Sequence, residues 1–186
     1  MPPEQRTRKL AALYLVRINC ALALSALALV GYLAITSSQV FLAPSVLPLA
    51  SSARLGTGVD DTWLACLPLA HVGGFAVIAR ALHTGARLVV HDGFQADAVQ
   101  QAARDGATAT ALVPTALQRI DPALFRVIVL GGARPPEHRP AHVHATYGLT
   151  ETGSGVVYDG RPLDGVEVNI AADGEVLLRC PMLLRC

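Results

Sequence analysis

The sequence is poor in the features that nucleic-acid-binding proteins need. Aromatic residues make up 5% and charged residues 16% of its 186 residues, and no stretch combines basic residues with interleaved aromatics. Lys9 is the only lysine, and the formal net charge is +1. Proteins that bind nucleic acid generally carry a basic patch or stripe. We therefore expect no nucleic-acid partner.

Closely spaced cysteines and hydrolase motifs are also missing. None of the cysteines forms a C-x-x-C pair; they are Cys20, Cys66, Cys180 and Cys186. Free thiols in a reducing compartment explain them better than a zinc site or a disulfide framework. The histidines of residues 138–144 lie in a proline-rich stretch that favours a solvated loop over a metal site. Residues 153–155 (Gly-Ser-Gly) lack the G-x-S-x-G spacing of a serine hydrolase.

Residues 1–50 differ in character from the rest of the chain. Arg17 and the basic residues before it precede a nearly uncharged run at 18–35. A membrane-spanning helix needs about 20 apolar residues, and basic flanks hold that end in the cytoplasm. Three interpretations stay open: an apolar membrane helix, a signal peptide, or out-of-frame sequence joined to a real domain. We expect a cytoplasmic protein, membrane-associated if the run at 18–35 is genuine, and a linker at 51–61.

From residue 62 to 186, short apolar runs alternate with helical patterns. We expect strands at 63–67, 87–91, 108–113 and 126–130, and helices at 73–83, 92–104 and from Pro114. Asp92 is a candidate helix cap, and Gly85 and Gly106 are candidate stops. This alternation predicts an α/β domain with a largely parallel sheet. Residues 166–170 and 175–179, joined through Asp173-Gly174, predict a β-hairpin after it.

Three segments follow expected strands and could form one site. They are residues 67–74, which include His71, the glycine pair 131–132 and residues 147–152 (Tyr-Gly-Leu-Thr-Glu-Thr). Ligands of open α/β sheets bind beyond the carboxyl ends of the strands. Glycines let a flat ligand approach the backbone, and a threonine followed by a glutamate offers groups for a phosphate and Mg²⁺. Each segment alone also fits an ordinary turn, surface carboxylate or helix-entry histidine, so their convergence carries the prediction.

Four blocks of the sequence resemble, in order, motifs of the adenylate-forming ligases, the acyl-CoA synthetase superfamily. The blocks are residues 63–74, 129–133, 147–152 and 173–182, and the resemblance extends from Trp63 to Arg185. Within the superfamily, residues 147–166 resemble the 2-succinylbenzoate–CoA ligases of menaquinone biosynthesis. The resemblance implies part of an adenylate-forming N-terminal domain and the AMP-forming ligation of a carboxylic acid to CoA.

The same resemblance implies roles for individual residues. His71 would border the acyl site, Thr150 would bond the α-phosphate, and Glu151 would hold Mg²⁺. The nucleotide site would be formed by Gly131, Gly132, Ala133, Tyr147, Gly148 and Thr150, with Tyr147 stacked on adenine. ATP, CoA and a small carboxylic acid would be the substrates. The protein would act mainly by positioning them and by neutralising phosphate charge.

The sequence departs from the superfamily pattern in several places. Residues 51–58 lie too close to Trp63 for the phosphate loop and contain no lysine, and Cys180 replaces a glycine. The ribose-binding aspartate, the hinge and the C-terminal domain would lie beyond Cys186. Each missing charge-neutralising contact is worth about 10²–10³ in rate. We therefore expect a ligase fragment with weak or no activity alone; the alternative is a membrane-anchored nucleotide-binding pseudoenzyme.

Overall fold

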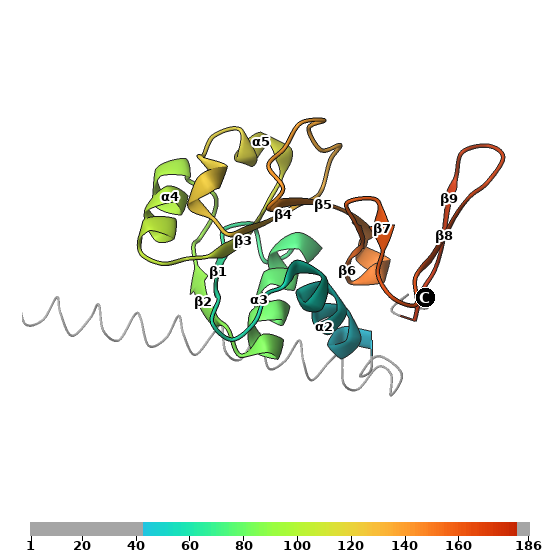
Figure 1. Cartoon of the computed structure of the whole chain (residues 1–186), viewed down its shortest axis with the longest axis horizontal. Coiled ribbons are helices and arrows are strands. Elements are labelled where there is room, and N and C mark those ends of the chain that lie inside the picture. The colour runs from blue at the N-terminus through green and yellow to red at the C-terminus, as the bar shows by residue number, and fades with distance from the viewer. Residues whose placement is uncertain (1–42, 182–186) are drawn as a thin grey trace, which may run out of the picture. The chain divides into compact units, whose positions relative to one another are not determined.

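The structure is a computed structural model that describes residues 43–181 (Figure 1). The apolar run at 18–35 lies outside the described residues. The helices are α2 (Ala43–Leu55), α3 (Val72–Thr84), α4 (Ala96–Arg104) and α5 (Pro114–Leu117), with 3-10 turns η1 (Pro122–Leu124) and η2 (Thr150–Thr152). The strands are β1 (Thr62–Ala65), β2 (Arg87–Val90), β3 (Ala109–Leu112), β4 (Val127–Leu130), β5 (Val143–Leu149), β6 (Ser154–Tyr158), β7 (Arg161–Pro162), β8 (Glu167–Ile170) and β9 (Val176–Arg179).

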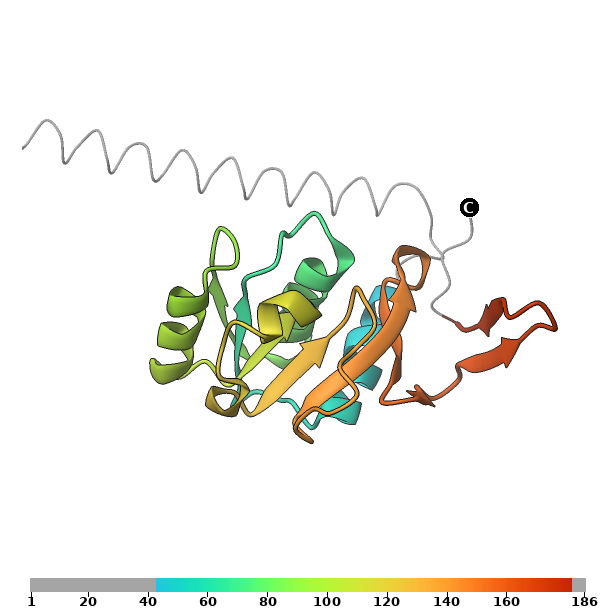
Figure 2. The ribbon, with the colours of Figure 1, turned by 90° about the horizontal axis from the view of Figure 1, so that it is seen from above.

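Seven of the strands form one mixed sheet. Their order is β2-β1-β3-β4-β5-β6-β7, parallel from β2 to β5 and antiparallel from β5 to β7. The predicted α/β class with a largely parallel sheet is confirmed. The predicted hairpin is confirmed as well: β8 and β9 form a separate antiparallel pair (Figure 2). At its turn the Asp173 carboxylate accepts a hydrogen bond from the Glu175 N–H at 3.0 Å, and Gly174 has φ +90°.

Apolar side chains cover both faces of the parallel strands. In β1, Trp63 and Ala65 pack in the cluster with α2 and α3, whereas Leu64 packs in the opposite cluster with α4 and α5. The four residues of β4 alternate between the same two clusters and are all buried. Strands buried on both faces are continuous apolar runs. This explains why the strands were predictable from the sequence.

Two expected elements differ from the structure. Residues 51–55, predicted to begin a linker, are helical and belong to α2, because Ser51, Ser52 and Leu55 are buried where α2 packs against α3 and β6. Helix α4 begins at Ala96 rather than at Asp92, and its N-cap is Gln95. Gly93 disfavours a helix at the predicted start. Tertiary packing thus makes residues 51–55 helical, and the glycine at position 93 explains the later start of α4.

Residues 43–181 contain no helix that is both long enough and apolar enough to cross a membrane. In the same range no group of three or more His, Cys, Asp or Glu side chains could hold a metal ion. Two of the histidines of residues 138–144 have other partners, and His144 lies in strand β5 rather than in the predicted loop. The His142 ring contacts the Pro122 carbonyl at 3.0 Å, and the His144 ring contacts Asp159 at 2.8 Å.

Candidate functional site

The predicted site segments follow parallel strands and therefore lie at one edge of the sheet. Residues 66–71 follow β1, and residues 131–133 follow β4. Turn η2 follows β5, which is paired with β4. Strand β3 separates β1 from β4, so His71 lies at the same edge but two strands away from Gly131. The topology thus brings the Gly131 segment next to the strand that leads into η2, and it places the His71 segment at the same edge, two strands away from Gly131.

His71 is the N-cap of α3 and is exposed. Its backbone carbonyl accepts hydrogen bonds from the N–H groups of Gly74 and Phe75, both at 3.0 Å, and its ring makes no capping bond. Gly74 is required here because a Cβ at this position would collide with the Pro68 carbonyl. The close approach fixes the start of α3 against the loop and leaves the His71 ring at the surface of this edge.

The segment after β4 is bare backbone packed against its neighbours. The Gly131 N–H donates to the Leu112 carbonyl at 3.1 Å. A Cβ on Gly131 would lie 2.9 Å from Thr146 Oγ1. Gly132 has φ +81°, which side-chain-bearing residues rarely adopt, and it is exposed together with Ala133. A flat ligand could therefore approach this backbone closely.

Tyr147 and Gly148 lie within strand β5 rather than in a loop after it. Strand β5 extends through both residues because β6 pairs with it, and the register shifts between them. The Tyr147 side chain is 42% exposed. A Cβ on Gly148 would collide with the Ser154 carbonyl. Strand β5, which carries the Tyr147 ring, can therefore pack this closely against β6 only because residue 148 is a glycine.

Turn η2 presents Thr150 and Glu151, and hydrogen bonds of the Thr152 hydroxyl to the backbone on both sides hold the turn in place. Thr152 is fully buried, and its Oγ1 accepts a hydrogen bond from the Leu149 N–H at 2.8 Å. The same hydroxyl lies 2.8 Å from the carbonyl oxygens of Leu149 and Ser154. Both Thr150 and Glu151 are exposed. An exposed hydroxyl and an exposed carboxylate are thus held side by side on a fixed turn.

A residue that the sequence does not single out lies behind this turn. Arg80 of α3 is buried and donates to the side chains of Ser154 and Tyr158 on β6. Thr152 likewise stands out only in the structure, because its role depends on its burial. The one sequence signal for Arg80 is a cation between Val77 and Ala81 on an otherwise apolar helix face.

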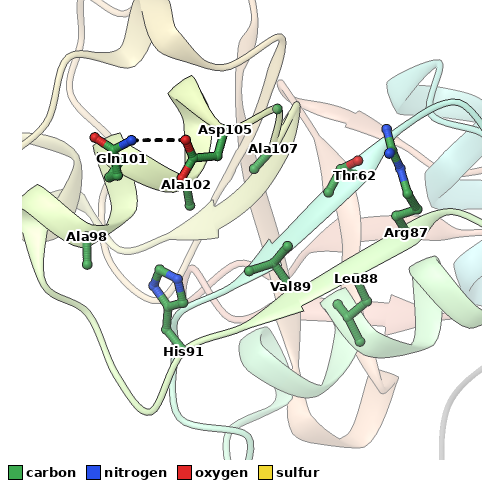
Figure 3. A pocket seen from close by; sticks show the side chains of 11 residues that line it. Thr62, Arg87, Leu88, Val89, His91, Ala98, Gln101, Ala102, Asp105 and Ala107 are labelled. Carbon is green, nitrogen blue, oxygen red and sulfur yellow. Dashed lines mark hydrogen bonds between the residues drawn. The ribbon is translucent and has the colours of Figure 1, made fainter.

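A cavity of about 680 Å³ lies elsewhere, between edge strand β2 and helix α4 (Figure 3). Its lining includes Thr62, Arg87 and His91, and on α4 the Gln101 side-chain amide donates to the Asp105 carboxylate at 3.0 Å. None of the predicted site residues lines it. The cavity opens beside the free edge of the sheet in the described part of the chain. The candidate site is therefore the strand-end edge and not this cavity.

Charged residues at the opposite end of β5 are paired with one another. The Asp159 carboxylate accepts hydrogen bonds from Arg139 at 2.7 Å and from the Ala145 N–H at 2.9 Å, and it contacts His144. Burial opposes ionisation, but the hydrogen bonds from Arg139 and His144 outweigh it and lower the pKa of Asp159. This cluster fixes the β5–β6 pair from the end remote from η2.

Residues 43–178 match the sequence model of a family described as AMP-binding enzyme. The chain belongs to the AMP-binding enzyme family. The family predicted from the ordered motifs is thereby confirmed. The match begins at residue 43 and so includes α2.

Relatives in this family share moderate identity with the chain. A 2-succinylbenzoate–CoA ligase of Lactococcus lactis is 33% identical over 165 aligned residues; the match covers 73% of this chain and 37% of the relative. A ligase of the same name from Bacillus anthracis is 30% identical over 168 aligned residues, and this match covers 70% of this chain and 35% of the relative.

Solved structures agree with the sequence matches. The O-succinylbenzoate coenzyme A synthetase (MenE) of Bacillus subtilis, in complex with ATP and magnesium, superposes with a TM-score of 0.69 at 25% identity. That match covers 78% of this chain and 38% of the synthetase. Wild-type E. coli MenE gives a TM-score of 0.63 at 31% identity, covering 76% of this chain and 35% of the enzyme. The chain therefore spans between a third and two fifths of the length of these relatives.

Proposed function

We propose that this chain carries the nucleotide-binding part of an ATP-dependent, AMP-forming acid–CoA ligase that acts on 2-succinylbenzoate. The observation that carries the proposal is the strand-end edge described above. There Gly131 and the exposed Gly132 lie beside the strand that presents Tyr147 and leads into Thr150 and Glu151. The substrate assignment is supported by relatives named as 2-succinylbenzoate–CoA ligases at 33% and 30% identity.

The residues at this edge fit a magnesium–nucleotide complex. Glu151 would hold Mg²⁺, because an exposed carboxylate supplies the hard oxygen ligand that this cation prefers. The Thr150 hydroxyl would donate to an α-phosphate oxygen, and the Tyr147 ring would stack on adenine. Gly131 packs against Thr146 too closely for a side chain, and Gly132 has a positive φ and is exposed, so a nucleotide could approach this backbone directly. Gly148 holds the tyrosine-bearing strand against β6, and Ala133 continues the exposed backbone.

The chemistry would place little covalent work on these residues. A substrate carboxylate would attack the α-phosphorus, pyrophosphate would leave, and the CoA thiol would then displace AMP to form the thioester. His71, at the start of α3, would border the acyl group. Orientation and neutralisation of phosphate charge would supply the rate enhancement. We propose that this takes place in the cytoplasm, with a carboxylic acid, ATP and CoA as the small-molecule partners.

Residues 43–181 contain no lysine, so they offer no ammonium group for the leaving pyrophosphate. We therefore propose nucleotide binding with weak or no ligase turnover for this polypeptide by itself. The membrane-anchored alternative depends on residues 18–35, which lie outside the described part of the chain, and no observation favours it.

The test is calorimetric titration of the purified chain with ATP, with and without Mg²⁺. We expect saturable binding that Mg²⁺ strengthens, and loss of that strengthening in Glu151→Gln. The matched control is Glu175→Gln, which changes an exposed carboxylate in the β8–β9 turn and should bind as the parent does. A folded chain that binds no nucleotide would refute the proposal. Calorimetric titration of the ATP-loaded chain with 2-succinylbenzoate, compared with benzoate, then tests the substrate assignment without requiring turnover.

A further inference from the structure

Arg80 is a buried cation that contacts three different elements. Its exposed fraction is 2%. Its Nε donates to Ser51 Oγ of α2 at 3.1 Å. Its Nη2 donates to Ser154 Oγ at 3.1 Å and to Tyr158 Oη at 2.8 Å, both on β6. The guanidinium carbon lies 5.6 Å from the ring centroid of Trp63 on β1.

No carboxylate compensates this charge within the described part of the chain. None of the ion pairs formed between residues 49–181 includes Arg80. Removing a guanidinium from water is expensive, and neutral hydroxyl acceptors recover only part of the cost. An apolar side chain of similar length would fill the same space without that cost. The contacts of Arg80 therefore fix the relative positions of α2, α3 and β6 more than they stabilise the fold.

Hydrogen bonds connect Arg80, through Ser154, to the turn that presents Thr150 and Glu151. Ser154, which accepts from Arg80 through its hydroxyl, has its carbonyl oxygen 2.8 Å from Thr152 Oγ1. Thr152 in turn accepts from the Leu149 N–H and closes η2. The guanidinium is thus two hydrogen bonds away from the hydroxyl that closes the turn.

The other end of the connection is helix α3 itself. His71 precedes the first residue of α3, and Arg80 lies nine residues further along the chain. At 1.5 Å per residue, this separates them by roughly 13 Å along the helix axis. A displacement of α3 relative to β6 would move His71 relative to Glu151. Arg80 is the side chain that bonds α3 to β6.

We propose that Arg80 is a positioning residue for the candidate site: through Ser154 it fixes the turn carrying Thr150 and Glu151 relative to the helix that presents His71. This inference rests on the proposed function for its consequence in nucleotide binding. Its structural part can be tested independently of that function.

The structural test is hydrogen–deuterium exchange of the full chain. In Arg80→Met we expect the hydrogen-bonded amides of Leu149 and Gly153 to exchange about tenfold faster, since a hydrogen bond from a charged group is worth at least that factor. Amides of β3 should be unchanged. The matched control is Arg126→Met, which removes a guanidinium bound to Asp61 at the opposite end of the sheet and should leave exchange of the Leu149 and Gly153 amides unchanged. Equal acceleration everywhere, or none at the turn, would overturn the inference.

Two further variants keep the test decisive if Arg80→Met fails to fold. Ser154→Ala retains the guanidinium but removes its link to the turn, and should accelerate the same amides. Tyr158→Phe removes only the bond to the far end of β6, and should affect them less. Trp63 is the only tryptophan of the chain and is fully buried beside Arg80, so its fluorescence reports whether each variant keeps the native core.

The functional test is a double-mutant cycle on Mg²⁺-dependent ATP binding. Arg80→Met should weaken binding about tenfold, as is common for residues that orient a metal ligand. Arg80→Lys should lie between, because the single nitrogen of lysine cannot take the place of both Nε, which donates to Ser51, and Nη2, which donates to the β6 hydroxyls. In a Glu151→Gln background the effect of Arg80→Met should shrink to the part that acts through Thr150, whereas a general structural role would give additive losses. If the parent chain binds no ATP, the proposed function fails, and the exchange experiment still decides the role of Arg80.

Discussion

Arg126 Nη2 donates hydrogen bonds to both carboxylate oxygens of Asp61, each 2.6 Å long. Arg126 directly precedes β4 and Asp61 directly precedes β1, so the pair connects the two loops before these strands. Asp61 also accepts from Thr108 Oγ1 at 2.7 Å and from the Gly58 N–H at 2.9 Å. Its side chain is 7% exposed, whereas that of Arg126 is 48% exposed. This cluster joins the amino ends of three neighbouring strands, at the edge opposite the candidate site.

The first prediction concerns the pH dependence of stability. Burial opposes ionisation of Asp61, but the hydrogen bonds from Arg126, Thr108 and Gly58 outweigh it and lower its pKa. A lowered pKa in the folded state stabilises the fold above the unfolded value of about 3.9, and this contribution is lost as the pH falls through the folded value. We expect Asp61→Asn to reduce the free energy of unfolding by about 1–3 kcal/mol at neutral pH. Its stability should then fall less steeply in acid.

Urea unfolding of the parent and Asp61→Asn between pH 3 and pH 7 measures both effects. Asp159→Asn is the appropriate comparison, because its hydrogen bonds to Arg139 and His144 also lower the pKa of its carboxyl group. Parallel stability curves for the parent and Asp61→Asn would contradict the prediction.

The second prediction concerns the close approach at Gly148. In Gly148→Ala the new Cβ would collide with the backbone of Ser154, which a side-chain rotation cannot relieve. Overpacking of this kind typically costs about 1–3 kcal/mol. We expect thermal unfolding at a lower temperature and weaker ATP binding. Gly93→Ala is the control, because a Cβ there meets nothing within 4 Å; an equal effect of the two substitutions would contradict the role assigned to Gly148.

The third prediction concerns the ring of Tyr147. If it stacks on adenine, Tyr147→Ala should weaken binding of ATP and of AMP by a similar factor, because both carry the base. Stacking of a base on an aromatic side chain is worth about 1–3 kcal/mol. Leu149→Ala shortens a similarly exposed side chain on the same strand and should bind nearly as the parent does. Unchanged affinity of Tyr147→Ala for both nucleotides would remove the residue from the site.

The parallel strands could be predicted from the sequence because their burial leaves a local pattern. The run Val127–Leu130 is apolar throughout, and Gly85 ends α3 in the left-handed conformation that glycine favours. Helix α2 could not be predicted in this way. Pro44 and Pro48 are typical of a linker, and its helical conformation is stabilised by contacts with α3 and β6, which come later in the sequence.

The strand-end location of the candidate site was likewise predictable, but its supporting residues were not. His71, Thr150 and Glu151 lie in motifs of recognisable residue types and spacing. Arg80 is 74 residues from Ser154 in the sequence, and the two meet because α3 packs on the sheet to which β6 is added by pairing with β5. Strand β6 itself is antiparallel to its neighbour and follows a glycine-rich turn, so no apolar run of the kind seen in β4 marks it.

The fourth prediction concerns Thr152, whose buried hydroxyl satisfies backbone groups on both sides of η2. Thr152→Val keeps the shape of the side chain but leaves the Leu149 N–H without its acceptor. Losing a hydrogen bond of this kind costs about 0.5–1.5 kcal/mol. Thr152→Ser retains the hydroxyl and should recover most of the loss, which urea unfolding can measure. Calorimetric titration should show Mg²⁺-dependent ATP binding weakened in Thr152→Val and largely restored in Thr152→Ser. Equal losses in both variants would mean that the methyl group, and not the hydroxyl, holds the turn.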